Sequence, residues 1–152
     1  MLVAAILLLP SPAAADFTAF LGVNPTPASR PVKGLAAGAG LLIVGFEFEY
    51  GNTSDDPLEL APALHTFMFN GLLQTPIPIA RMQFYGTMGG GVFRETLNAS
   101  SETNLGVNVG GGVKISLAGP LRLRLDYRVF TLKGSPRYAT PQRFYAGLNL
   151  KF

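Results

Sequence analysis

The stretch Leu121-Arg122-Leu123-Arg124-Leu125-Asp126-Tyr127-Arg128-Val129 decides the fold of this protein. Its odd-numbered positions are all apolar, and its even-numbered positions are all charged. In a helix this order would spread the charges around every side, whereas in a β-strand it sorts them onto one of two faces. The stretch therefore predicts a strand with one apolar face and one charged face.

The same alternation recurs along most of the chain. It is clear in 43–51, in 104–117 and in the last residues, where every second side chain is apolar. The connections between such segments are alternately long and polar, as in 133–141, and short, as in 118–119, although 74–80 is longer than the other short connections. Short runs of alternating hydrophobicity bounded by turn residues are typical of antiparallel β-proteins. We predict eight strands, at 17–24, 32–39, 42–51, 59–73, 81–95, 103–117, 120–132 and 142–152.

Composition excludes several classes of protein. The chain has 152 residues, of which 14% are charged, whereas about 25% is usual for soluble domains. Nearly half of the residues are hydrophobic, which argues against intrinsic disorder. Without Cys, a disulfide scaffold and a cysteine-ligated metal site are excluded. There is no apolar run of about 18 residues, the length that a transmembrane helix needs.

The first residues predict a secretory signal peptide. Residues 2–9 are all apolar, and the small-residue stretch Ala13-Ala14-Ala15 follows them. A short apolar segment that ends in such a site is typical of a cleaved signal. We expect residues 1–15 to be the signal peptide and 16–152 to be a single β-domain beginning at Asp16.

Alternation alone allows two kinds of barrel. A soluble lipocalin-like barrel has its apolar face inside, and a membrane barrel has its apolar face outside. Three features favour the membrane barrel. The polar face is rich in Gly, several strands reach the 9–11 residues that cross a bilayer, and aromatic residues gather near the predicted strand ends. We therefore predict an all-β fold, a closed eight-stranded antiparallel up-and-down transmembrane barrel, with the soluble barrel as the alternative.

The C-terminal segment 143–152 resembles the last strand of bacterial outer-membrane β-barrel proteins. Segments 44–50, 106–114 and 123–128 extend the resemblance to the small eight-stranded barrels that are similar to the transmembrane domain of outer membrane protein A. The resemblance implies a location in the outer membrane of a Gram-negative-type bacterium. It also implies recognition of the last strand by the barrel-assembly machinery, through Leu148, Leu150 and the terminal Phe152.

The most informative candidate site is a set of charges on the face predicted to line the lumen. Acidic and basic side chains of different strands can meet there as charge-assisted hydrogen bonds. The set predicts a lumen filled by salt bridges, and a narrow pore with a basic lining is the alternative. Its members are Glu47, Glu49, Lys114, Arg122, Arg124, Asp126, Arg128, Arg143 and Lys151.

Other motifs give no support for catalysis. His65 is the only histidine, and Thr66 and Phe67 follow it, so the His-x-Ser pattern of the barrel-type lipid A deacylases is absent. A single His without Cys makes a transition-metal site improbable. The runs 89–91 and 110–112 lie inside strand patterns and lack the Lys-Ser/Thr and helix of a phosphate-binding loop. The basic groups are expected to face inward, so they form no stripe for nucleic acid.

These observations predict a non-enzymatic integral outer-membrane protein with a role in envelope integrity or surface adhesion. The alternative is a narrow pore or transporter for ions or small solutes, and a membrane lipid-modifying enzyme ranks third. We expect no cofactor, no metal and no nucleic-acid partner. The expected partners are membrane lipid and the assembly machinery, and a monomer is favoured.

Overall fold

A computed structural model describes residues 13–152 of the chain and shows a closed antiparallel barrel of eight strands. Each strand pairs with its neighbours in chain order, which is the up-and-down topology that the sequence predicts. Within the described residues, no helix is long and apolar enough to cross a membrane. The strands are β1 (Ala14–Asn24), β2 (Arg30–Leu41), β3 (Val44–Thr53), β4 (Ala63–Gln74), β5 (Met82–Leu97), β6 (Ser100–Ala118), β7 (Leu121–Leu132) and β8 (Gln142–Lys151).

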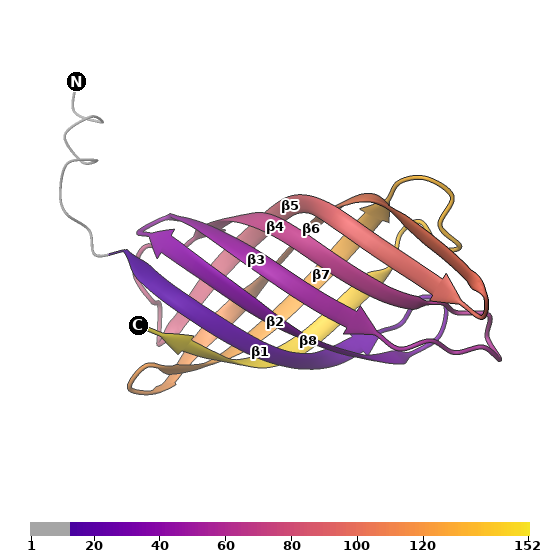
Figure 1. Ribbon diagram of the computed structural model, residues 1–152. Helices are drawn as coiled ribbons and strands as arrows, with labels where there is room; N and C mark the ends of the chain where they lie inside the picture. Colours follow the sequence, from indigo (N-terminus) through magenta and orange to yellow (C-terminus); the bar gives the residue numbers. More distant parts are fainter. Residues whose placement is uncertain (1–12) are drawn as a thin grey trace, which may run out of the picture.

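Pairing between the first and last strands closes the barrel. The β1–β8 ladder runs from Asp16 opposite Lys151 to Val23 opposite Phe144. β1 begins and β8 ends at the same end of the barrel, which we call the terminal end, and we call the opposite end the loop end (Figure 1). Closure leaves no open sheet edge along this seam, and hydrocarbon demands this because it cannot hydrogen-bond free backbone groups.

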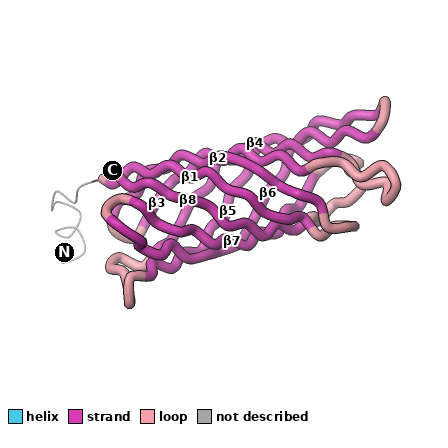
Figure 2. The backbone as a smooth tube through the Cα atoms, turned by 90° about the horizontal axis from the view of Figure 1, so that it is seen from below, coloured by secondary structure: helices cyan, strands magenta, loops and turns pink. Residues whose placement is uncertain are grey.

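The connections lie at the two ends of the barrel (Figure 2). At the terminal end, Leu42-Ile43 and Gly119-Pro120 are two-residue turns. Leu42 and Gly119 both have positive φ, as does Asn98 in the two-residue turn between β5 and β6 at the loop end. A tight turn between antiparallel strands often needs this left-handed conformation, which Gly and Asn adopt more readily than other residues.

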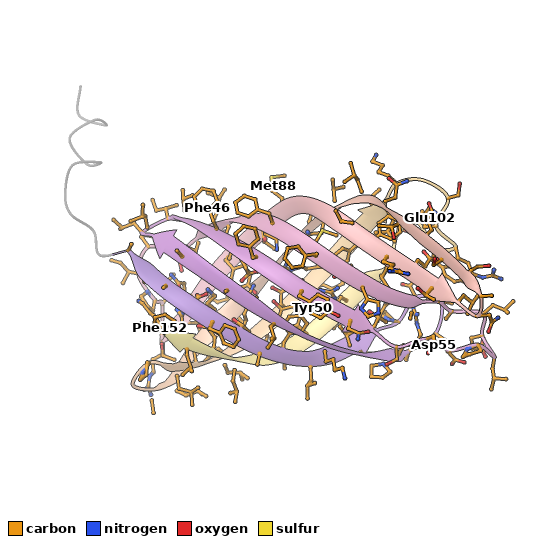
Figure 3. The ribbon with its side chains drawn as sticks, viewed as in Figure 1. Phe46, Tyr50, Asp55, Met88, Glu102 and Phe152 are labelled. Carbon is orange, nitrogen blue, oxygen red and sulfur yellow. The ribbon has the colours of Figure 1, made fainter. Side chains whose placement is uncertain are left out.

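The two faces of the sheet differ as a membrane barrel requires. On β3, Phe46 and Phe48 are 54% and 56% exposed, whereas Glu47 and Glu49 are 2% and 1% exposed. Side chains such as Phe46 and Met88 stand on the outside of the barrel (Figure 3). Phe69 on β4 packs beside both phenylalanines of β3, with ring centroids 6.0 and 4.9 Å away. The soluble barrel, which would bury the apolar face, is therefore excluded.

Strand register shows where the apolar exterior ends. On the outward face of β2, β3, β4 and β5, four residues that are paired from strand to strand form an apolar row. The next outward-facing row toward the loop end is polar. Because paired residues on neighbouring strands lie side by side, this change of row marks the upper limit of the apolar belt on these strands. The apolar row is Leu35, Tyr50, Phe67 and Val92, and the polar row is Lys33, Asn52, His65 and Arg94.

Several predicted boundaries are wrong in the same region. Residues 96–102 are not a loop, because β5 continues to Leu97 and β6 begins at Ser100 around a turn of two residues. β4 begins at Ala63, and residues 59–62 belong to the preceding connection, where Asp56 forms an isolated bridge with Ala61. Polar composition suggested loops, but the β5–β6 hairpin rises above the apolar belt, where polar side chains are solvated.

The predicted signal peptide, residues 1–15, lies mostly outside the described residues, which begin at 13. Ala14 and Ala15 belong to β1, and the Ala15 backbone N–H donates to the carbonyl oxygen of Phe152 at 2.9 Å. Cleavage after Ala15 stays a prediction. It would make Asp16 and Lys151 the first residue pair between β1 and β8.

Candidate functional site: the filled lumen

Three buried arginines occupy the middle of the lumen. Arg124 and Arg128 come from β7 and Arg143 comes from β8, and none of the three is more than 2% exposed. A buried cation is stable only when carboxylates and other acceptors replace the water that it has lost. The three acidic partners are Glu47 and Glu49 from β3 and Asp126 from β7. We call these six residues the charged layer.

Arg128 connects all three carboxylates. Its Nη2 lies 3.0 Å from Glu47 Oε1, its Nη1 lies 2.9 Å from Glu49 Oε2, and its Nε lies 2.9 Å from Asp126 Oδ1. Arg124 forms a second pair with Glu47 through both terminal nitrogens and also contacts Asp126 at 3.1 Å. Each carboxylate is therefore shared by two cations, so the six groups form one network.

Arg143 joins the network to its surroundings. Its Nη1 lies 2.5 Å from Glu49 Oε1, and its Nη2 donates to Thr66 Oγ1 at 2.8 Å. The guanidinium carbon lies 4.5 Å from the ring centroid of Phe130, a distance suited to a cation–π contact. The side chain thus spans the lumen from β8 to β3 and β4.

Two tyrosines complete the hydrogen bonding of the charged layer. The hydroxyls of Tyr85 and Tyr145 both donate to Asp126 Oδ2, the latter at 3.1 Å. Arg124 Nε in turn donates to the Tyr85 hydroxyl at 2.8 Å. Tyr145 also stacks on Phe20, with ring centroids 4.0 Å apart. Alternation placed Tyr85 and Tyr145 on the polar face, but sequence reasoning left both out of the candidate site because it gathered only charged side chains.

Glycines make room for these long side chains. A Cβ atom added to Gly51 would lie 2.6 Å from Nη2 of Arg143, and one added to Gly112 would lie 2.6 Å from the Tyr85 hydroxyl. Gly51 on β3 and Gly112 on β6 both face the lumen, where these long side chains lie against them. This placement gives a physical reason for the Gly-rich polar face of the sequence.

An apolar layer lies above the charged layer, toward the loop end. Its side chains come from β4, β5 and β7 and are at most 5% exposed. Phe130 follows Arg128 by two positions on β7, so both side chains point into the lumen at successive heights. The sequence prediction of a wholly polar lumen omitted this layer, whose members are Leu64, Met68, Phe93, Phe130 and Leu132.

A polar recess lies below the charged layer and opens at the terminal end. Asp16 Oδ2 lies 2.6 Å from Lys114 Nζ and 3.0 Å from Arg122 Nη2. Asp16 was absent from the predicted set because it comes at the predicted start of the mature chain. Lys151, which was in the predicted set, is exposed at the rim and makes none of the ion pairs among the described residues.

Two carboxylates at the loop end hold the connection 133–141 against the β5–β6 hairpin. Glu95 accepts a hydrogen bond from the Arg137 backbone N–H at 2.8 Å, and Glu102 accepts one from that of Ser135 at 2.6 Å. Glu95 follows the outward-facing Arg94, beyond the apolar belt. Burial, with repulsion from Glu102, raises the pKa of Glu95 above its ordinary value, although the Arg137 N–H opposes the shift.

His65 lies on the outside of the barrel. Its Nδ1 lies 2.9 Å from the hydroxyl of Tyr50 on the neighbouring strand. Within the described residues, no group of three or more His, Cys, Asp or Glu side chains is placed to hold a metal ion.

The comparison with known proteins rests on solved structures. No protein-family model matches the sequence, and no curated protein matches it. The N-terminal β-barrel domain of Pseudomonas aeruginosa OprF superposes with a TM-score of 0.71 at 14% identity, over 91% of this chain and 97% of that one. Neisserial surface protein A gives 0.67 at 16% identity, over 92% and 96%. The outer membrane enzyme PagL gives 0.57 at 13% identity, over 89% and 98%.

The fold is that of the small outer-membrane barrels. Together with the apolar exterior, this fold places the chain in the outer membrane of a Gram-negative-type bacterium, with lipid around the strands. The small outer-membrane barrels include a protein named as an enzyme, so the activity of this chain has to be argued from its own residues.

Proposed function

We propose that this protein is a non-enzymatic outer-membrane barrel with a closed lumen, acting in envelope integrity or in surface adhesion. The observation that carries the proposal is the stacking of two tightly packed layers across the lumen. Arg124 and Arg128 are fully buried among carboxylates in the charged layer. Phe93 and Phe130 are buried in the apolar layer, which lies next to the charged layer on its loop-end side.

The charged layer supports closure for an electrostatic reason. The charges that line a water-filled pore keep contact with solvent, which is how they act on passing ions. Here the three guanidinium groups and three carboxylates instead form ion pairs with one another in a space with almost no exposure. Separating them to admit an ion would leave buried charges without partners, which is strongly unfavourable.

A narrow pore or transporter is the second candidate function. The polar recess at the terminal end favours it, because it gives water a way into that end of the lumen. To conduct, such a protein would have to open both the charged layer and the apolar layer.

Recording in planar lipid bilayers tests the proposal. We expect the purified protein to insert without resolved conductance steps. The double variant Arg128→Ala/Phe130→Ala thins both layers on β7, and we expect it to conduct. The matched control Tyr127→Ala/Val129→Ala changes outward positions of the same strand and should stay silent. Conductance steps from the wild-type protein would overturn the closed lumen and support the pore.

The surroundings of His65 support a non-enzymatic role. A catalytic histidine in acyl transfer contacts a nucleophile and is oriented by a third group. The hydrogen-bond partner that the structure gives His65 is Tyr50, whose phenol is a poor nucleophile at neutral pH. Incubation with purified lipid A and with phospholipids should release no fatty acid. Release that disappears in the His65→Ala variant would contradict the proposal.

Orientation and assembly complete the proposal. Outer-membrane barrels keep short turns and termini on the periplasmic side, so the loop end would face outward. The barrel-assembly machinery would then recognise Leu148, Leu150 and Phe152, which are exposed along one face of the last strand. Signal cleavage after Ala15 and a monomeric state are part of the same proposal.

A further inference from the structure

Charge is unevenly distributed along the lumen. The charged layer holds three arginines and three carboxylates, so its formal charges balance. Below it, Lys114 and Arg122 face one carboxylate, that of Asp16, and both contact the same oxygen atom. Lys114 is only 4% exposed. The terminal end of the lumen therefore carries one buried positive charge in excess.

The other neighbours of the two cations do not remove this excess. Arg122 Nε donates to Asn149 Oδ1 at 2.7 Å, and its Nη1 donates to Gln83 Oε1 at 3.1 Å. Lys114 Nζ lies 5.7 Å from the ring centroid of Tyr85. These partners are neutral. The other carboxylate that lines the recess, that of Glu47, already pairs with both Arg124 and Arg128.

Donor groups remain free on both cations. A lysine ammonium has three N–H donors, and within the described residues the Lys114 ammonium donates one hydrogen bond, to Asp16. An arginine has five donors, and Arg122 uses three of them on Asn149, Gln83 and Asp16. An arginine fork next to a lysine is the arrangement that suits a phosphate-type oxyanion.

Space for a ligand lies beside these donors. The recess has a cavity volume of about 40 Å³ and opens at the terminal end. Its wall includes Gly40, Gly45 and Gln74 near the mouth, and Lys151 adds a third cation to the lining. On the other side, the charged layer blocks the way to the loop end, so a ligand enters from the terminal end.

We propose that this recess is a binding site for a phosphate-type oxyanion, held by Lys114 and Arg122 beside Asp16. The bound anion neutralises the excess charge that the lumen carries at this end. The predicted cleavage after Ala15 strengthens the site, because the new α-ammonium group of Asp16 would add a further positive charge at the mouth.

Titration with inorganic phosphate tests the site. The full chain, refolded in non-ionic detergent micelles, is titrated at constant ionic strength, and backbone amide shifts are followed by NMR. We expect saturable shifts at Gly45 and Gln83, which line the recess. Lys114→Gln should weaken binding by about tenfold or more, because it removes one charge-assisted hydrogen bond to the anion. The matched control Lys33→Gln removes an outward-facing cation and should bind as the wild type does.

Gln83→Glu tests the same idea without removing a buried cation. A carboxylate at this position would supply the missing negative charge next to Arg122, so phosphate binding should be lost while the fold is kept. Glycerol phosphate, titrated in the same way, distinguishes a phosphate group carried on a small molecule from free phosphate. The proposal is overturned by shifts that follow total salt without saturating, or by equal phosphate affinity in the wild-type and Gln83→Glu proteins.

Discussion

The inward and outward faces of the same strands are organised by different rules. On β3, Phe46 and Phe48 face lipid, and they contact a further aromatic side chain that also faces lipid. Between them, Glu47 contacts two named arginines from β7. Lipid accepts any apolar side chain, so the outer face specifies only a class of residue. The inner face specifies individual partners, because a buried charge needs a particular opposite charge within reach.

Removing one inward carboxylate should have the largest effect on stability, and it tests whether the inner face is more selective than the outer face. Glu49→Ala leaves Arg143 and Arg128 each without one of their partners in the charged layer. We expect a loss of about 3–5 kcal/mol in the free energy of unfolding, the usual result of breaking a buried ion pair. The measurement is urea unfolding in phospholipid vesicles, followed by the heat-dependent shift in gel mobility.

The matched control for Glu49→Ala is its outward neighbour. Phe48→Leu exchanges one lipid-facing apolar side chain for another and should lower stability by less than about 1.5 kcal/mol. If Glu49→Ala prevents folding, the milder variant Glu49→Gln supplies the measurement. Equal urea midpoints for wild type and the Glu49 variants would show that the inner face is no more selective than the outer one.

Two consecutive glycines on β5 allow a sharper comparison. A Cβ added to Gly91, on the inward face, would lie 1.9 Å from the Phe67 carbonyl oxygen. A Cβ added to Gly90, on the outward face, would have its nearest neighbour at 3.5 Å. Gly91→Ala should therefore destabilise by about 1–3 kcal/mol through overpacking. Gly90→Ala should change stability by no more than about 0.5 kcal/mol.

The same unfolding assay measures both glycine variants. If the two substitutions change the free energy of unfolding equally, steric crowding does not distinguish the inner face from the outer face at Gly90 and Gly91.

The smallest expected effect concerns pH and the loop end. Because the pKa of Glu95 is raised in the folded protein, the folded state holds the proton more tightly than the unfolded state does. Its contribution to stability is complete below the ordinary pKa of Glu and is lost as the pH rises through the raised value. Unfolding midpoints of wild type should fall over this range, and those of Glu95→Gln should fall less. Parallel pH profiles for the two proteins would contradict this assignment.

Local sequence predicted much of the fold and part of the site. Alternation in Leu121–Val129 assigns β7 and its two faces before any tertiary contact is known, and the same reasoning placed Glu47 and Arg124 inside. It could not pair them, because these residues are 77 positions apart in the chain. It also missed the apolar layer, although the break in alternation at Val129–Leu132, where Phe130 and Leu132 face inward, was a visible signal.

Strand ends were the weakest part of the prediction. Lys151 is two positions after the inward-facing Asn149 on β8, yet it is exposed, because the strand ends there at the rim of the barrel. Asp16 shows the converse, since a residue at the start of β1 reaches Lys114 and Arg122 across the lumen. Odd or even position along a strand assigns a side chain to the inner or outer face. Its position along the barrel axis decides whether an inner-face side chain is buried.

The sequence by itself determined that this chain forms two-faced strands, because a period of two is a local property that no tertiary contact is needed to see. The period alone left open which face lies inside, and it took the Gly-rich polar face and the strand lengths to favour an apolar exterior. Only the tertiary structure decided which charges meet, where apolar side chains replace them and where one cation is left in excess. Those features depend on closure and register, which bring Asp16 to within 2.6 Å of Lys114 from the other side of the barrel.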